Sequence, residues 1–307
     1  MSTVDTAAYA RASRAATEVA GGQHYPPGAL YMVATPIGNL ADITLRALHL
    51  LQVADTVACE DTRRTQALLR SYAIEKSAAQ LLSVREHNEI SAAQTVIERL
   101  RQGQRVAYAS DAGTPAISDP GARLVAAVRL ANFPVIPLPG ASSVTTALSV
   151  AGMVGDGPQH RAFVFVGFLS AKAGERSTAI EQLRIEPRAV VMLEAPHRIE
   201  ALALALTALG QRKLMVGREL TKQFEEVATL GAQDFATWLA DDVNRLRGEF
   251  VLVLHPMQCS APSEPDTRVL KLLLTELPLK TAVKLAAEIT GQARNQLYEL
   301  ALGMKQG

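Results

Sequence analysis

Short runs of apolar, often β-branched residues recur through the first half of the chain and limit its possible folds more than any other feature. The runs occupy residues 30–34, 56–59, 81–84, 105–109 and 134–138. Segments with helical periodicity separate them, as where Ile43, Ala47, Leu50 and Leu51 recur on one helical face. Continuous apolar strands joined through helices are typical of a parallel sheet covered on both faces. The first half is therefore predicted to form an α/β domain with a mostly parallel sheet.

The second half has a different pattern. Strands are expected at 162–166, 189–193, 214–217, 225–230 and 249–254, with helices at 175–183, 199–209 and 234–239. Because several strands are joined by short links, which only antiparallel neighbours permit, we expect a mixed sheet. Gly- and Pro-rich segments at 152–158 and 260–265 mark boundaries. The predicted parts are a disordered tail (1–27), an N-terminal α/β domain (28–154), a second α/β domain (155–259) and a linker with a small helical domain (260–307).

Two segments bear on the cellular location. Residues 1–27 lack the apolar core of a signal peptide, which is why they are expected to be a disordered tail. The uncharged stretch 130–155 is long enough to cross a bilayer, but its prolines, glycines and hydroxyl residues favour a buried strand, a loop and a helix. We expect a cytoplasmic protein with no membrane partner.

Charge and composition exclude several function classes. The 31 Lys and Arg against 30 Asp and Glu leave a net charge of +1, so bulk positive charge cannot hold a nucleic acid. Aromatic residues make up only 5%, which disfavours a protein built on base stacking. The cysteines, Cys59 and Cys259, are far apart and the histidines are scattered. Neither a disulfide framework nor a metal site is expected.

Three loops rich in Gly, Pro and Ser follow predicted strands of the first domain. They occupy residues 35–40, 110–121 and 139–143. None matches the dinucleotide fingerprint or the phosphate-binding loop, which disfavours a dinucleotide or nucleoside triphosphate. The carboxyl ends of parallel strands meet at one edge of a sheet, where backbone groups can approach a ligand. We therefore expect a ligand site at this edge.

Charged clusters end three further strands, and each has two interpretations. At 60–63, Asp61 is either a helix cap or, with Glu60, a group that polarises a hydroxyl. At 194–198, a lone histidine after proline is more often structural than catalytic. The cluster at 217–222 is either an exposed hairpin or a contact with a polyanion.

Taken together, these motifs resemble the ribosomal RNA small subunit methyltransferase I family of the tetrapyrrole-methylase superfamily. The resemblance is carried in order by residues 35–44, 60–63, 110–121, 139–143, 166–169, 195–198, 218–222, 248–250, 277–280 and 286–291. Ser170 departs from the usual Pro of the family, and Leu193-Glu194-Ala195-Pro196 replaces a usual Tyr-Glu-Ser-Pro. These departures concern the local contacts of two strand ends.

The resemblance implies a two-domain tetrapyrrole-methylase-like fold with a small C-terminal helical appendage of helix-turn-helix type. It implies S-adenosylmethionine as methyl donor and 2′-O-methylation of a cytidine in the decoding region of 16S rRNA. It also implies 16S rRNA as the partner and a homodimer; the substrate is the rRNA in the 30S subunit or, as the alternative, free rRNA. The alternatives are methylation of a corrinoid or porphyrin ring, and a non-catalytic rRNA-binding assembly factor.

The resemblance also suggests site residues. Asp61 and Glu60 are expected to orient the acceptor hydroxyl, with Lys222 and Glu194 behind them. The expected donor-binding residues are Pro36, Gly38, Asp111, Gly113, Thr114, Gly140, Ser142, Ser143, Leu193 and Pro196. The expected RNA-binding residues are Arg63, Arg198, Arg218, Lys284 and Arg294. For the C-terminal helices, packing against another domain or subunit is an equally good interpretation of the basic residues.

Overall fold

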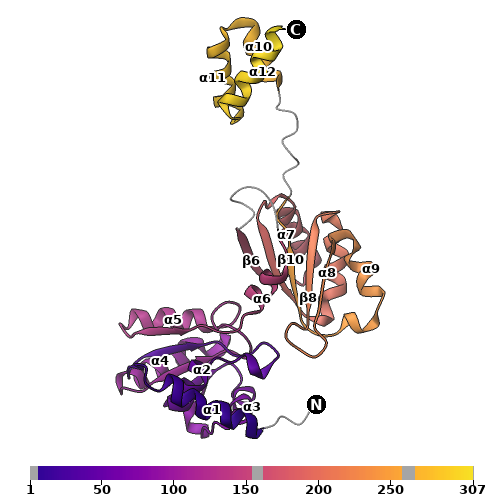
Figure 1. Ribbon diagram of the computed structural model, residues 1–307. Helices are drawn as coiled ribbons and strands as arrows, with labels where there is room; N and C mark the ends of the chain where they lie inside the picture. Colours follow the sequence, from indigo (N-terminus) through magenta and orange to yellow (C-terminus); the bar gives the residue numbers. More distant parts are fainter. Residues whose placement is uncertain (1–5, 154–161, 258–266, 307) are drawn as a thin grey trace. The chain divides into compact units, whose positions relative to one another are not determined.

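The computed structural model describes residues 6–153, 162–257 and 267–306 (Figure 1). Contacts divide the chain into a larger unit that ends at Pro256 and a smaller one that begins at Met257. The boundaries predicted at 154/155 and 259/260 lie outside the described residues, as does Cys259. The further division of the larger unit into two domains stays a prediction, and the two units are described separately below.

The first sheet is parallel throughout and has the strand order β3-β2-β4-β1-β5. Its strands are β1 (Leu30–Val33), β2 (Thr56–Cys59), β3 (Leu81–Ser83), β4 (Val106–Ala109) and β5 (Val135–Leu138). Val33, the last residue of β1, pairs with Ala109 and Leu138, so three strands end at the same level. The loops that follow them therefore leave from one edge of the sheet, as predicted.

Helices cover both faces of this sheet, and two apolar clusters result. The helices after the first strand are α2 (Leu45–Val53), α3 (Thr62–Ser71), α4 (Glu89–Arg101) and α5 (Gly121–Leu130). One cluster joins α2 and α3 to the sheet, with Leu50 and Leu69 buried. The other joins α4 and α5, with Val96 and Leu124 buried. The α/β fold and the covered parallel sheet are confirmed.

The N-terminal segment corrects one prediction. Residues from Thr6 to Ala20 form the helix α1, which packs against α2, so the expectation of a disordered tail is wrong for this part of the chain. Ala16 and Ala20 are 0% and 1% exposed. Alanine favours helix and lets two helices approach closely, and a search for large apolar residues overlooks such a face.

Hydrogen bonds also fasten α1 to the domain. The Ser13 hydroxyl donates to the Tyr72 carbonyl at 2.6 Å in a buried contact, and Gln52 Nε2 donates to the Ser13 carbonyl at 3.0 Å. Tyr9 meets the Tyr72 ring edge to face, with centroids 5.5 Å apart. The Tyr72 hydroxyl in turn donates to the Leu40 carbonyl at 2.6 Å, in the segment that follows β1. The helix is thus an integral part of the first domain.

Replacing Ser13 with Ala tests this docking. We expect a loss of about 1–2 kcal/mol in the free energy of unfolding, because a buried carbonyl loses its donor. Urea unfolding followed by circular dichroism measures the difference, and Ser177→Ala, at an exposed position of α7 (Ala173–Ile185), is the matched control. Equal stability of the two variants would contradict a docked α1.

The second sheet is mixed and has the order β6-β7-β10-β8-β9. Its strands are β6 (Phe163–Phe168), β7 (Ala189–Glu194), β8 (Lys213–Arg218), β9 (Glu226–Gly231) and β10 (Phe250–Leu254). β6 and β7 are parallel, and the other neighbours are antiparallel. The mixed sheet is confirmed; a short connection joins the antiparallel pair β8 and β9, whereas β10 returns from further along the chain to pair with β7 and β8.

The two faces of the second sheet pack differently. One face is covered by α7, α8 (Ile199–Leu206) and α9 (Phe235–Ala240), whose side chains form a large apolar cluster with it. The other face packs against α6 (Ser143–Val150), which follows β5 of the first sheet (Figure 1). Val144 and Ala147 of α6 are buried there with Val191 and Val253 of the sheet. This contact connects the loops of the first sheet to the second.

The described residues of the smaller unit form three helices around one apolar cluster. They are α10 (Thr267–Glu276), α11 (Leu279–Thr290) and α12 (Arg294–Gln306). Gly291 ends α11 with φ +69°, a left-handed conformation that favours glycine, so the turn predicted there is confirmed. The predicted helical appendage is also confirmed. Within the described ranges, no helix is both long and apolar enough to cross a membrane.

Candidate active site

The loops after β1 and β4 are joined at the carboxyl edge of the first sheet. Thr35 and Gly113 exchange two backbone hydrogen bonds, each 3.0 Å long. The Thr35 hydroxyl donates to the Ser110 carbonyl at 3.1 Å, and the Ser110 hydroxyl donates to the Gly113 carbonyl at 2.7 Å. These short polar side chains satisfy buried backbone groups, and the two loops are therefore held in one fixed arrangement.

The loop after β5 joins the same assembly, where two glycines are required by their surroundings. The Thr114 hydroxyl donates to the Ala141 carbonyl at 3.0 Å. Gly113 has φ +83°, and a Cβ there would lie 3.3 Å from Ile37 Cγ2. A Cβ on Gly140 would lie 2.8 Å from Ala34 Cβ. The sequence prediction that the three loops converge is confirmed, and Gly113, Thr114 and Gly140 come together.

A cavity of about 270 Å³ lies where these loops meet the strand ends of the second sheet. Its lining residues come from both sheets: Ile37, Ala112, Ser118, Ser143, Phe168, Leu193, Glu194, Ala195, Pro196, Leu220, Lys222, Glu249, Phe250 and Val251. The volume is near the lower end of the ~300–1,000 Å³ typical of ligand sites. We take this cavity as the candidate active site.

Some predicted site residues line the cavity and others do not. Ser143, Leu193 and Pro196 of the predicted donor set line it, as do Lys222 and Glu194. The other predicted donor-binding residues lie in or beside the adjoining loops: Pro36, Gly38, Asp111, Gly113, Thr114, Gly140 and Ser142. Sequence reasoning missed Glu249, Val251 and Phe168, although Phe168 belongs to one of the motifs that carry the resemblance.

The carboxylates at the ends of β2 and β4 bind each other's backbone. The Asp111 N–H donates to Glu60 Oε1 at 3.2 Å, and the Asp61 N–H donates to Asp111 Oδ1 at 3.3 Å. Arg64 pairs with Asp111 at 2.9 Å. Burial raises the pKa of Glu60 above its ordinary value, despite its hydrogen bond from the Asp111 N–H. A raised pKa makes Glu60 a better proton acceptor than an ordinary carboxylate near neutral pH.

Asp61 has a structural role of its own. It is the N-cap of α3, where its carboxylate accepts the Arg63 N–H at 2.8 Å, so the capping interpretation is confirmed. The Arg63 guanidinium also pairs with it, and these hydrogen bonds lower the pKa of Asp61 to about 2. Neither Asp61 nor Glu60 is among the lining residues of the cavity. Their catalytic role stays a prediction.

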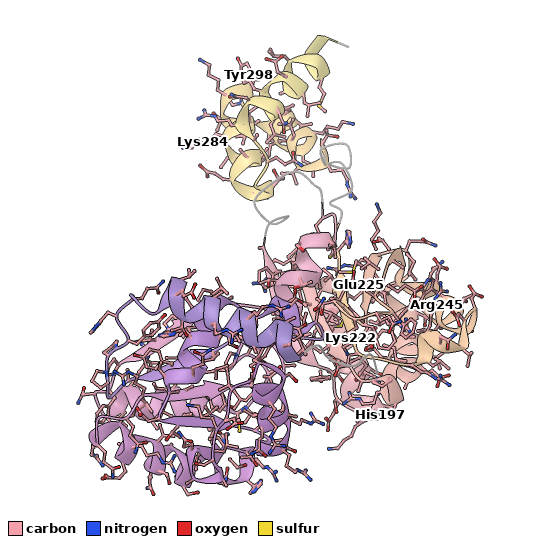
Figure 2. All side chains as sticks on the ribbon, turned by 60° about the horizontal axis from the view of Figure 1, so that its bottom comes forward. His197, Lys222, Glu225, Arg245, Lys284 and Tyr298 are labelled. Atoms are coloured by element: carbon pink, nitrogen blue, oxygen red, sulfur yellow. The ribbon has the colours of Figure 1, made fainter. Side chains whose placement is uncertain are left out.

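Lys222 (Figure 2) lies in the connection between β8 and β9. Two carboxylates hold its ammonium. Its Nζ lies 2.8 Å from Glu219 Oε1 and 3.0 Å from Glu249 Oε2. Burial disfavours the charged ammonium, but the two hydrogen bonds outweigh it and raise the pKa of Lys222. An ammonium has three N–H donors, so one remains for a ligand in the cavity. The raised pKa keeps Lys222 charged at neutral pH, and its two carboxylate partners fix the position of the ammonium.

Backbone strain surrounds this lysine. Glu219 and Thr221 have φ +50° and +67°, in the left-handed region that is unfavourable for residues with a Cβ. Gly38 must lack a Cβ, because one there would lie 2.4 Å from Lys222 Cγ. Gly248 has φ +91°, and its Cβ would lie 2.4 Å from Glu219 Cγ. Strain of this kind persists where the surrounding structure imposes it, often at functional sites.

The predicted phosphate contact at Arg218 is not supported by its surroundings. Its side chain is 8% exposed and donates to the carbonyls of Phe224, Asn244 and Arg247, besides its contact with Glu226. These contacts occupy the N–H groups of Arg218 that a phosphate would need. Arg218 thus fastens the end of the second sheet, and we leave it out of the RNA-contacting set.

The other predicted RNA-binding residues differ in exposure. Arg63 is 86% exposed, although it pairs with Asp61. Arg198 is 26% exposed, pairs with the buried Glu194 at 3.1 Å and donates to the Leu169 carbonyl. In the smaller unit, Lys284 (Figure 2) and Arg294 are both exposed. In the part of the chain that the structure describes, no three His, Cys, Asp or Glu side chains are grouped as metal ligands.

Comparisons with known proteins agree with this geometry. The sequence model of the family Tetrapyrrole (Corrin/Porphyrin) Methylases matches residues 29–235, and that of the RsmI C-terminal HTH domain matches residues 260–305. Relatives named ribosomal RNA small subunit methyltransferase I include one from Neisseria meningitidis, 48% identical over 91% of this chain and 94% of the relative. Another, from Pseudomonas aeruginosa, is 44% identical over 90% of this chain and 97% of the relative.

Solved structures agree on the fold. A cobalt precorrin-4 methyltransferase covers 75% of this chain and 98% of its own, with a TM-score of 0.53 and 18% identity. A diphthine synthase covers 74% of this chain and 90% of its own, with a TM-score of 0.55 and 14% identity. At these identities the likeness concerns the fold alone, since one fold can carry several activities.

Proposed function

Because the chain belongs to the ribosomal RNA small subunit methyltransferase I family, we propose that it transfers a methyl group from S-adenosylmethionine to the 2′-oxygen of a cytidine in the decoding region of 16S rRNA. At the level of the family, the enzyme is a methyltransferase of small-subunit ribosomal RNA. The observation that supports the proposal most is the cavity between the glycine loops and the strand ends of the second sheet, with Lys222 in its wall.

The residues of the cavity suit the proposed donor. Ile37, Leu193 and Val251 offer apolar surface for the adenine ring and the aliphatic part of the methionine chain, and Ser143 offers a hydroxyl. The glycines at 113 and 140 keep side chains away, so a ligand could hydrogen-bond to the backbone of the loops. When bound, the donor supplies an electrophilic methyl group on a sulfonium.

The proposed contribution of the chain is mainly positioning. In-line transfer requires the acceptor oxygen, the methyl carbon and the sulfur to be aligned, and fixed geometry can supply up to roughly 7–11 kcal/mol of the barrier reduction. Lys222 is proposed to bind the acceptor side through its remaining N–H, as a cation for a phosphate or for the 2′-oxygen. Glu60 and Asp61 are proposed to orient the acceptor hydroxyl, and the raised pKa of Glu60 suits a proton acceptor.

RNA binding is proposed to rest on a few cations. Arg63, Arg198, Lys284 and Arg294 are the proposed phosphate contacts, which position the RNA without reading its sequence. With a net charge of +1, the enzyme is expected to bind generic RNA weakly and to depend on the shape of the assembled 30S subunit. We also propose that it works in the cytoplasm as a homodimer.

The test is a methyl-transfer assay. Purified protein is incubated with tritiated S-adenosylmethionine and 30S subunits from a strain that lacks the modification, and the label is mapped by nuclease digestion. We expect label on the ribose of one cytidine. Label on an added precorrin instead would favour the corrinoid alternative. Donor binding without any transfer would favour an assembly factor.

A further inference from the structure

Phe168 is a large apolar side chain left open to solvent at the wall of the cavity. It is the last residue of β6 and is 52% exposed, yet it lines the cavity together with Leu193 and Pro196. Exposed apolar residues scattered singly are common on protein surfaces and need no explanation. Phe168 differs from such residues because it lines a cavity that Lys222 also lines.

The backbone of β6 is altered so that Phe168 faces the cavity. Phe165 packs on the α6 side of the sheet and Val166 on the opposite side, so regular alternation would place residue 168 with Val166. Instead, a bulge between Phe165 and Gly167 shifts the register by one residue. Phe168 is thereby paired with Leu193, a residue of the α6 side that lines the cavity.

The bulge depends on glycine. Gly167 has φ +66°, a conformation that strains any residue with a Cβ. Bulges of this kind re-aim side chains, often next to active sites. Without the extra residue, the Phe168 ring would lie on the face covered by α7 and α8. At the end of β6, Phe168 is therefore half exposed beside the cavity and is not buried beneath the helices.

We propose that Phe168 is the stacking platform for the nucleobase of the nucleoside that accepts the methyl group. The inference rests on the proposed function and adds to it the residue that holds the acceptor base. Bases of single-stranded RNA are commonly splayed out and stacked on aromatic side chains, and a half-exposed ring offers one free face for this.

The surroundings favour the base of an RNA over another apolar partner. Phe168 shares the cavity with Lys222 and with two carboxylates, Glu194 and Glu249, and His197 is exposed in the segment after β7 (Figure 2). Arg198 donates to the carbonyl of Leu169, the residue that follows Phe168. A flat ring beside hydrogen-bonding and charged groups matches a nucleobase, which has a flat face and polar edges, better than it matches an aliphatic partner.

Substitutions at Phe168 test the proposal. Phe168→Ala is expected to raise the KM for 30S subunits roughly 10–100-fold, in line with the loss of one base stack. Phe168→Leu keeps the apolar bulk without a flat ring and should behave like the alanine variant. Phe168→Trp keeps a flat aromatic ring and should therefore retain binding. The matched control is Phe163→Ala, at a residue of the same strand that is 47% exposed and is not among the cavity-lining residues.

Two further measurements make the outcome decisive. The affinity of Phe168→Ala for the donor, measured by calorimetry without RNA, should equal that of the wild type. If the donor affinity falls while the KM for 30S subunits is unchanged, the ring binds the adenine of the donor and the proposal is overturned. Co-sedimentation with 30S subunits measures binding without turnover. Equal binding of wild type and Phe168→Ala would also overturn it. Absence of methyl transfer by the wild type would instead count against the proposed function.

Discussion

Replacing Lys222 with Met is expected to lower the rate of methyl transfer by about 100- to 1,000-fold, the usual effect of removing one fixed polar donor from an active site. The side chain lines the cavity, and its ammonium is fixed by Glu219 and Glu249 before any substrate binds. A cation that needs no reorganisation during the reaction contributes more than a mobile surface lysine. Single-turnover transfer to 30S subunits measures the effect.

Lys222→Arg is the informative comparison. It keeps the charge, but the planar guanidinium cannot reproduce the contacts of a compact ammonium, so we expect partial activity. Thermal unfolding of both variants controls for folding, since Glu219 is only 19% exposed and loses its partner in Lys222→Met. A stable Lys222→Met protein with wild-type rates would remove Lys222 from the mechanism.

The pH dependence follows from the direction of the shift. Because the pKa of Lys222 is raised above 10.5, the ammonium stays charged through neutral and moderately alkaline pH. The stability that this pairing contributes is present below the unfolded-state pKa and is lost as the pH rises through the folded-state value. Glu219→Gln keeps the shape of the side chain but removes a negative charge that stabilises the ammonium, so the pKa of Lys222 should fall. The alkaline loss of activity should then begin at lower pH. If Lys222 acted as a general base, the rate of methyl transfer would instead rise with pH as the lysine loses its proton.

The sequence predicted the fold well because buried parallel strands leave a strong local signal. The strands at 30–33 and 106–109 are continuous, almost fully buried apolar runs, and the Gly- and Pro-rich loops that follow them mark the edge of the sheet where ligands bind. The convergence of Thr35, Gly113 and Ala141 could be expected from the rule that parallel strands end at one edge. The helix α1 was missed because its most buried residues are small, Ser13, Ala16 and Ala20, and give no strong apolar periodicity.

Other features depend on contacts that no local pattern reveals. The bulge that turns Phe168 toward the cavity is suggested by Gly167, but a glycine in a strand does not indicate its direction. One of the two carboxylates that hold Lys222 is Glu249, which is 27 residues away in the sequence. The two residues meet because β10, which follows Glu249, pairs with β8. The sequence therefore located the loops of the first domain and part of the wall from the second sheet, whereas Glu249 and the orientation of Phe168 required the fold.

The sequence suggested that Arg218 binds a phosphate of the RNA, whereas in the fold its guanidinium donates to backbone carbonyls of the protein. Replacing Arg218 with Ala is expected to lower the free energy of unfolding by roughly 2–4 kcal/mol, because three carbonyls lose their donor and an ion pair is broken at a buried site. Chemical denaturation measures this loss.

The matched variant is Arg63→Ala, whose side chain is 86% exposed. We expect it to change stability little, since ion pairs between solvent-exposed side chains contribute little, and to weaken 30S binding while reducing its salt slope by about one. Below its melting temperature, Arg218→Ala should show the opposite result: reduced stability and an unchanged salt slope. If Arg218→Ala instead flattens the salt dependence at wild-type stability, its guanidinium binds phosphate and the carbonyl contacts around it are dispensable.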